Sequence, residues 1–127
     1  MPFRARVLAT LLILGSFSPA LAQDATKGEN VFKKCSACHK VGDAAKNGVG
    51  PMLNGVVGRK ASAVDGFVYS DASKEAASKG LIWSEENLLK YLENPLVFMP
   101  KTKMVFPGLK DEQERKDVIA YLKTYSK

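Results

Sequence analysis

Apolar residues recur at helical spacing in three places along the chain, each time after a residue that favours a helix N-terminus. The first place follows Asp24, and Val31 and Phe32 fall there on one face of a helix. We expect a first helix that buries this face and whose last turn carries residues 35–39.

The second place begins at Trp83. Ser84 suits the N-cap of a helix, and Trp83 and Leu88 have the spacing of a hydrophobic staple. Two acidic residues follow the cap, where the helix dipole is positive. Asn94 and Pro95 end the pattern, because proline cannot continue the backbone hydrogen bonds of a helix. The segment predicts a second helix from residue 84 to residue 94.

The third place follows Asp111, which forms a capping-box-like pair with Glu114. Apolar residues then recur at helical spacing: Val118, Ile119, Tyr121 and Leu122. We expect a third helix here, with these side chains in the core.

A long irregular segment, residues 41–66, separates the first two helices and contains six glycines and one proline. Apolar residues recur throughout it: Val49, Met52, Leu53, Val56, Val57 and Val64. Long loops are functional or disordered, and this apolar content favours packing against something over disorder. No stretch alternates as a β-strand does. The sequence therefore predicts an all-α domain of three main helices, short helical turns and long loops.

Residues 1–22 have the pattern of a secretory signal peptide. Arg4 and Arg6 form a basic start, an apolar stretch follows, and Ala20-Leu21-Ala22 is an A-x-A cleavage site. The apolar stretch falls short of the about 20 residues of a membrane span, and an uncleaved amphipathic anchor is the alternative. We expect cleavage after Ala22, export to the periplasm and one mature domain, residues 23–127.

The whole chain carries 19 basic and 13 acidic side chains, a net charge of +6. Without Arg4 and Arg6, 17 basic side chains remain against 13 acidic ones, a net charge of +4. The chain has no long basic run and no repeated aromatic-basic pattern. This mild excess favours a negatively charged protein surface over nucleic acid as a partner.

The pentapeptide Cys35-Ser36-Ala37-Cys38-His39 holds both cysteines and the only histidine of the chain. The Cys-x-x-Cys-His pattern is that of c-type haem attachment, with two thiols for the haem and an imidazole for its iron. Structural zinc usually needs four such ligands, whereas this chain has three. A dithiol oxidoreductase is another alternative, but it requires strands around the motif. The motif predicts haem c, whose apolar bulk would complete the core of a small domain.

The sixth ligand of the iron has to come from elsewhere, since the chain has no second histidine. The candidates are Met52, Met99, Met104, a lysine or water. A methionine thioether suits an electron-transfer haem, whereas an open sixth position would indicate a haem enzyme or a gas-binding protein. Composition alone leaves this choice open.

Further motifs occur in the order found in one known family: Gly50-Pro51, Gly58-Arg59-Lys60, Gly66-Phe67-Val68-Tyr69, Tyr91-Leu92-Glu93-Asn94-Pro95, Pro100-Lys101-Thr102-Lys103-Met104 and Val118-Ile119-Ala120-Tyr121-Leu122. With the Cys-x-x-Cys-His pentapeptide, they make the chain resemble the class I c-type cytochromes, the family of mitochondrial cytochrome c and bacterial cytochrome c2. The resemblance covers essentially all of the mature domain. It implies the small cytochrome c fold, wrapped around one covalently attached haem c.

The resemblance also implies roles for individual residues. Cys35 and Cys38 would form the thioether bonds to haem c. His39 would be the proximal ligand of the iron and Met104 the distal one, which makes the other candidate methionines packing residues.

Other residues would support the haem and its ligands. The carbonyl of Pro51 would accept the imidazole N–H of His39 and fix its tautomer. Tyr91 would lie near the methionine sulfur. The residues expected to hold the haem propionates are Arg59, Tyr69, Trp83 and Thr102.

The chain differs from the mitochondrial form at several positions. The segment 70–82 is longer, and Ser73 stands near an expected asparagine. Leu96 and Val97 replace lysines, which weakens the basic docking ring on that side. Gly28 keeps the spacing that lets the first helix cross the last one closely, a crossing that needs a small residue.

The function implied by the resemblance is one-electron transfer by a carrier that is not an enzyme. Its donor would be a membrane cytochrome bc complex, and its acceptor a photosynthetic reaction centre or a cytochrome oxidase. We expect a monomer that docks transiently by the face around the haem edge, with no nucleic-acid partner. The candidate docking lysines flank the haem-bearing segments: Lys34, Lys40, Lys101, Lys103 and Lys110.

Overall fold

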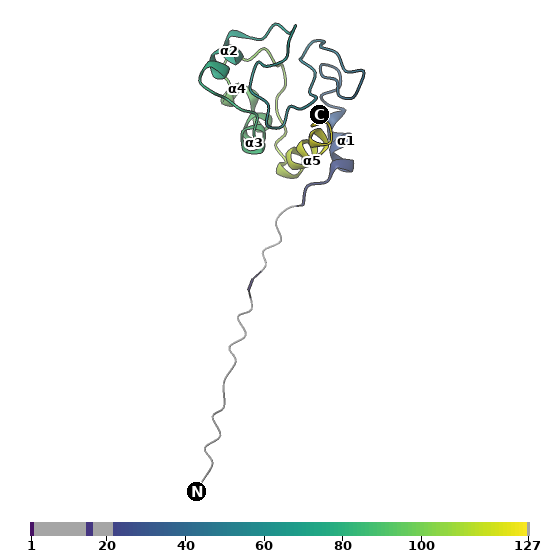
Figure 1. Cartoon of the computed structure of the whole chain (residues 1–127), viewed down its shortest axis with the longest axis vertical. Helices are drawn as coiled ribbons and strands as arrows, with labels where there is room; N and C mark the ends of the chain where they lie inside the picture. Colours follow the sequence, from purple (N-terminus) through teal and green to yellow (C-terminus); the bar gives the residue numbers. More distant parts are fainter. Residues whose placement is uncertain (2–14, 17–21, 127) are drawn as a thin grey trace.

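The computed structural model describes residues 1, 15–16 and 22–126 (Figure 1). Most of the expected signal peptide, residues 2–14 and 17–21, lies outside the described residues. The helices are α1 (Ala25–Phe32), α2 (Asp71–Ser78), α3 (Glu85–Glu93), α4 (Pro95–Phe98) and α5 (Glu112–Lys123). The described part of the chain contains no sheet, only one isolated bridge between Lys60 and Ile82. The predicted all-α class is confirmed.

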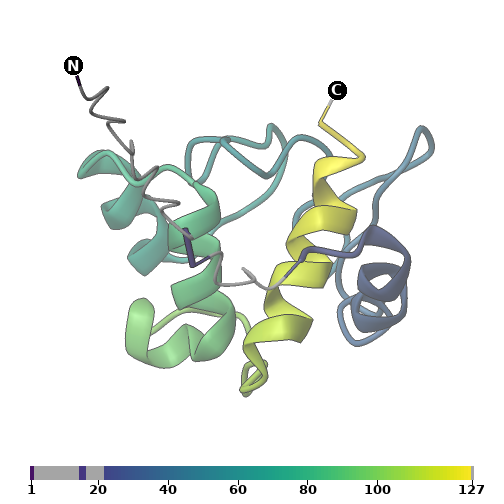
Figure 2. The ribbon, with the colours of Figure 1, turned by 90° about the horizontal axis from the view of Figure 1, so that it is seen from below.

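Helix α5 is the centre of the helical packing, and Figure 2 shows it between α1 and the pair formed by α3 and α4. In Figure 1, the long irregular segment between α1 and α2 arches over the helices. The buried core contains Val31, Phe32, Val56, Leu88, Leu92, Leu109, Val118, Ile119 and Leu122. None of the helices in the described part has the length and hydrophobicity of a membrane span.

Gly28 lies where α1 crosses α5. A Cβ atom at this position would overlap the backbone carbonyl of Asp117 and lie 2.8 Å from the Cβ of Tyr121. The two helices therefore approach as closely as a residue without a side chain allows, which agrees with the predicted need for a small residue.

The predicted N-caps are present on α1, α3 and α5. The side chain of Asp24 accepts from Thr26 N, that of Ser84 from Asn87 N and that of Asp111 from Gln113 N. The predicted pairing of Asp111 with Glu114 is wrong, because the Glu114 carboxylate instead pairs with Lys34 Nζ at 3.2 Å. This ion pair links α5 to the turns after α1.

Helix α1 is shorter than predicted. It ends at Phe32, and residues 33–38 form successive turns. The reason is a change of hydrogen-bond spacing: Cys35 N donates to Phe32 O at 2.8 Å, and Cys38 N donates to Cys35 O at 3.1 Å. Such i to i+3 bonds wind the chain more tightly than an α-helix, so the two thiols lie in turns beyond the helix.

Helices α2 and α4 complete the fold. Ser70 caps α2, which buries none of its residues and has no apolar side chain larger than alanine by which the sequence could predict it. Helix α3 ends at Glu93, as expected from Asn94 and Pro95. Pro95 then begins α4, where its missing N–H costs no helical hydrogen bond.

Candidate haem site

A cavity of about 650 Å³ lies among α1, α3, α5 and the long loops. This volume is within the about 300–1,000 Å³ typical of sites that enclose a small molecule. All the site residues predicted from the sequence line it: Cys35, Cys38, His39, Pro51, Arg59, Tyr69, Trp83, Tyr91, Thr102 and Met104. Of the other candidate ligands, Met99 and two lysines, Lys34 and Lys103, also line this cavity, whereas Met52 lines an adjoining hollow.

The His39 ring is held by backbone at one end of the cavity. Its Nδ1 lies 2.7 Å from the Pro51 carbonyl oxygen. Since a carbonyl only accepts, Nδ1 carries the proton and donates, which leaves the lone pair on Nε2 for a metal. A Cβ on Gly50 would collide with the ring, so this glycine allows the loop to pass against the imidazole. No role for Gly50 was predicted from the sequence, although the glycine directly precedes Pro51 in a family motif.

Burial determines the protonation of this end of the site. Desolvation lowers the pKa of His39, partly offset by its hydrogen bond to Pro51, and favours the neutral imidazole that binds metals. Desolvation also raises the pKa of the Cys35 thiol, with Cys38 adding to the effect. A reactive redox cysteine needs the opposite, a lowered pKa.

A chain of hydroxyls holds Met104 at another part of the cavity. The Tyr91 hydroxyl donates to Met104 Sδ at 3.4 Å and lies 3.2 Å from Thr102 Oγ1. Because the single Tyr91 proton is directed to sulfur, Thr102 donates to Tyr91. Burial raises the pKa of Tyr91, so the phenol keeps this proton. Thr102 Oγ1 also accepts from Met104 N at 3.4 Å, and its expected contact with a haem propionate stays a prediction.

Aromatic rings enclose this chain of hydroxyls. The Tyr91 ring packs against Trp83 with 4.8 Å between centroids, and against Phe98 with 5.7 Å. Buried aromatic packing of this kind restricts the rotamers of Tyr91. Its hydroxyl is thereby kept in place beside the Met104 sulfur.

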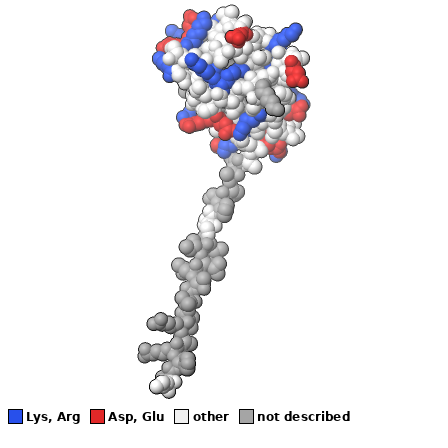
Figure 3. All heavy atoms as spheres, in the orientation of Figure 1, with Lys and Arg blue, Asp and Glu red and all other residues white. Residues whose placement is uncertain are grey.

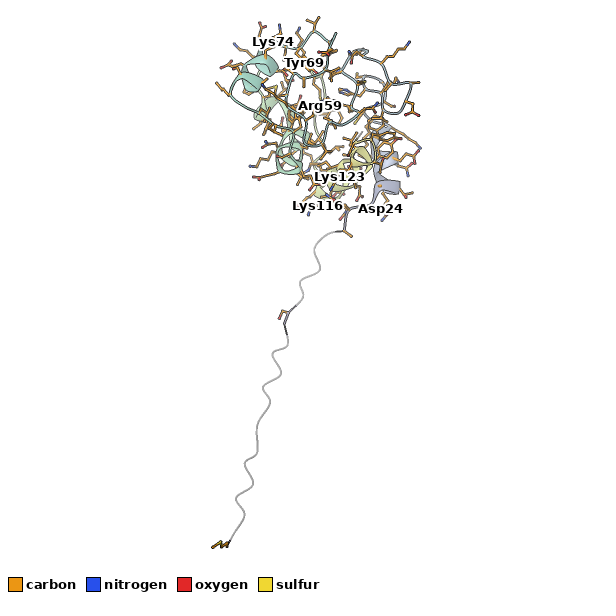
Figure 4. The ribbon with its side chains drawn as sticks, in the orientation of Figure 1. Asp24, Arg59, Tyr69, Lys74, Lys116 and Lys123 are labelled. Atoms are coloured by element: carbon orange, nitrogen blue, oxygen red, sulfur yellow. The ribbon has the colours of Figure 1, made fainter. Side chains whose placement is uncertain are left out.

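Arg59 and Tyr69 provide free hydrogen-bond donors in a third part of the cavity. Nη1 of Arg59 donates to the carbonyls of Met52 at 3.2 Å and Asn54 at 2.8 Å. Its Nε is buried without a partner among the described residues. The Tyr69 oxygen accepts from Val64 N at 3.0 Å, so the phenolic proton remains available. In Figure 4, Arg59 and Tyr69 lie above Asp24, the N-cap of α1, and above Lys116 and Lys123 of α5.

A buried guanidinium N–H without an acceptor is costly. Desolvation lowers the pKa of Arg59, while the nearby Tyr69 raises it. An anionic carboxylate in the cavity would supply a strong acceptor for the unpartnered Nε and for the free Tyr69 proton.

Comparison with known proteins now identifies the family. The sequence matches the family described as "Cytochrome c" over residues 25–126. The chain belongs to the cytochrome c family. It is 46% identical over 123 residues to the cytochrome c2 of Blastochloris viridis, a match that covers 97% of this chain and 94% of that one. The cytochrome c2 of Rhodomicrobium vannielii is 55% identical over 112 residues, covering 88% and 87% of the two chains.

Solved structures agree with the sequence matches. The structure of cytochrome c2 from Rhodospirillum centenum superposes with a TM-score of 0.78 at 50% identity, covering 82% of this chain and 99% of that chain. The predicted family and the small cytochrome c fold are thereby confirmed. The protein is a cytochrome c2-like electron carrier and not an enzyme.

Membership of this family implies a covalently bound haem c, and the site fits one. The cavity is largely apolar, and Cys35 and Cys38 border it. The buried Arg59 Nε has no hydrogen-bond acceptor among the described residues, and a haem carboxylate would provide one. Imidazole and thioether groups, which line this cavity, are donors that suit a low-spin electron-transfer haem.

Proposed function

We propose that this protein is a periplasmic one-electron carrier whose haem c is attached to Cys35 and Cys38, with His39 and Met104 as its iron ligands. The observation that carries the proposal is the single cavity bordered by both thiols, the oriented imidazole and the hydrogen-bonded thioether. When bound, the haem supplies the redox couple, in which iron alternates between the ferric and ferrous states.

The chain's own residues keep the ligands still during electron transfer. Pro51 fixes the tautomer and direction of the His39 ring from the backbone. Tyr91 donates to the Met104 sulfur, and Thr102 in turn hydrogen-bonds to the Tyr91 hydroxyl. Since each ligand is oriented before the electron arrives, little rearrangement accompanies its transfer.

The mouth of the cavity provides the docking face in this proposal. Three valines line the cavity and are largely or fully exposed: Val49, Val68 and Val105. Lys103 lies on the same lining. An apolar patch with a basic rim suits brief, low-area contacts with a donor and then an acceptor. Figure 3 shows another feature of the surface, basic and acidic side chains interspersed over one face.

The candidate docking lysines differ in how they are engaged. Lys34 pairs with Glu114, Lys40 donates to Ser36 O, and Lys110 donates to Glu93 O. Lys101 and Lys103 have no such side-chain partner within residues 22–126. We therefore favour these two for the docking face. The proposed donor is a membrane cytochrome bc complex, and the proposed acceptor is a photosynthetic reaction centre or a terminal oxidase.

Optical spectra of the matured protein test the ligation. We expect a low-spin haem with the far-red sulfur-to-iron band in the ferric form and no response of the ferrous form to carbon monoxide. Met104→Ala should lose the far-red band and bind carbon monoxide, whereas the control Met52→Ala should keep the wild-type spectrum because Met52 lines a different hollow. A high-spin wild-type protein, or an unchanged Met104→Ala spectrum, would refute the assignment.

Cell fractionation tests the proposed compartment. The red protein should appear in the periplasmic fraction, and its mass should correspond to residues 23–127 plus one haem. A full-length chain retained on the membrane would instead support the uncleaved anchor.

A further inference from the structure

Ser62 adopts a backbone conformation that few residues other than glycine adopt. Its φ is 57°, and Lys101 is the only other non-glycine residue with a positive φ within the described residues. A serine in this left-handed region is destabilised relative to glycine, and such positions persist only where the surrounding structure enforces them. The conformation of Ser62 therefore requires a cause.

Backbone hydrogen bonds around the isolated Lys60–Ile82 bridge hold the chain just before Ser62. Gly58 N donates to Trp83 O at 2.8 Å, and Trp83 N donates to Arg59 O at 2.8 Å. Ala61, which is buried, donates its N–H to Leu81 O at 3.0 Å. Ser62 directly follows this hydrogen-bonded segment, so the bonds between residues 58–61 and residues 81–83 restrict where it can lie.

The side chain of Ser62 is directed at α2. Its Oγ lies 2.8 Å from the Oγ of Ser73. Ser73 is itself held in place, because its N–H donates at 3.1 Å to the Oγ of Ser70, the buried N-cap of α2. Ser73 also lines the haem cavity. Ser62 is thus connected to the cavity by its hydrogen bond with the Ser73 hydroxyl.

Only one proton can lie between the two hydroxyl oxygens. If Ser62 donates, the proton of Ser73 is free to be directed elsewhere, and the cavity is available to it. Arg59 and Tyr69, which line the same cavity, also present hydrogen-bond donors without a protein acceptor. The Ser73 hydroxyl would then be a third donor, beside Arg59 and Tyr69, for an anionic acceptor in the cavity.

We propose that Ser62 is a positioning residue for the reduction potential: it donates to Ser73 and thereby turns the Ser73 hydroxyl into the cavity as a donor to a haem carboxylate. This inference rests on the proposed function, since it requires haem in the cavity. The positive end of the Ser73 O–H dipole then faces the haem, in a part-buried setting. The reduced haem, which carries one more electron, is stabilised, and the potential rises.

Midpoint potentials and urea unfolding of the purified haem protein test the proposal together. Ser62→Ala should lower the reduction equilibrium constant about threefold, which corresponds to about 28 mV at 59 mV per tenfold change for one electron. Ser62→Gly should lower the potential as much, yet keep or raise the urea midpoint, because glycine removes the left-handed strain. If Ser62 had a purely structural role, the midpoint potential of Ser62→Gly would not fall while its urea midpoint stayed the same or rose.

Ser73→Ala should lower the potential at least as far as Ser62→Ala, and the double variant should add nothing to Ser73→Ala, because Ser62 acts through Ser73. The matched control is Ser78→Ala on the same helix, whose hydroxyl donates only to Glu75 O and which should keep the wild-type potential. Wild-type potentials in both Ser62 variants, or additive effects in the double variant, would overturn the inference. Failure of the proposed function would appear earlier, as a wild-type protein without a low-spin haem spectrum.

Discussion

Replacing Gly28 with alanine should be among the most damaging single-methyl changes in this protein. The added Cβ would meet the Asp117 carbonyl oxygen within overlap distance, with the carbonyl carbon at 2.6 Å and Tyr121 Cβ at 2.8 Å. Two of these atoms belong to the backbone of α5 and cannot rotate away. Helix α1 would have to move off α5.

The cost of that movement has two parts. Forcing a methyl group into a packed helix crossing costs about 1–3 kcal/mol. Separation of the helices also stretches the 3.0 Å hydrogen bond from Asp24 N to the Asp117 carboxylate, whose residue is only 3% exposed. Weakening a hydrogen bond to a buried charged group costs about 1.5 kcal/mol or more. We therefore expect a loss of about 3 kcal/mol, which lowers the melting temperature by roughly 12–24 °C.

Thermal and urea unfolding of the haem protein, followed by far-ultraviolet circular dichroism, measure this loss. Glu29→Ala is the matched control, because Glu29 is the next residue of α1 and is exposed. It should change stability by no more than about 0.5 kcal/mol. A Gly28→Ala protein that melts within a few degrees of wild type would refute the account of the crossing.

Three other perturbations test separate parts of the molecule. Tyr91→Phe removes the donor to Met104 Sδ, and we expect the reduction potential to fall by on the order of 20–40 mV in a redox titration. An unchanged potential would show that this hydrogen bond does not influence the iron. Lys103→Glu should slow electron transfer to partner proteins at low salt, and the difference in rate from wild type should shrink as the salt concentration rises. The control Lys27→Glu on α1 should keep the wild-type rate. Equal rates of Lys103→Glu and wild type at every salt concentration would show that Lys103 is not part of the docking face. The hydrogen bond with Tyr125 is the main cause that raises the pKa of Tyr121 to about 12. An NMR titration of Tyr125→Phe should therefore find Tyr121 ionising nearer pH 10, and the wild-type protein should lose stability between pH 10 and 12, where the unfolded tyrosine ionises first.

The sequence predicted those elements whose stability is encoded locally. Asp24, Ser84 and Asp111 are caps in the structure because each precedes an apolar helical stripe, and both signals coincide there. The family motifs added the site residues, and their side chains converge on one cavity although they are spread from Cys35 to Met104. No periodicity within the long loops could have shown this convergence.

The structure differs from the predictions where contacts between distant parts of the chain outweigh the local sequence pattern. Glu114 had the spacing of a capping box, but it pairs with Lys34, which the fold brings near from 80 residues away. Helix α2 has no buried residue and depends on the Ser70 cap, a signal too weak to predict a helix alone. The end of α1 was misplaced because the turns after Phe32 continue the helical sense with a shorter hydrogen-bond spacing.

The two sides of the cavity are held by different kinds of interaction. His39 is fixed by the Pro51 carbonyl and by close backbone at Gly50, so its position depends on the main chain. Met104 depends on the Tyr91 and Thr102 side chains, in a loop where Lys101 has a φ of 66°. Side-chain hydrogen bonds to sulfur are weaker than main-chain constraints, and a strained loop gains stability by relaxing. We therefore expect a perturbation of the site to displace Met104 before His39.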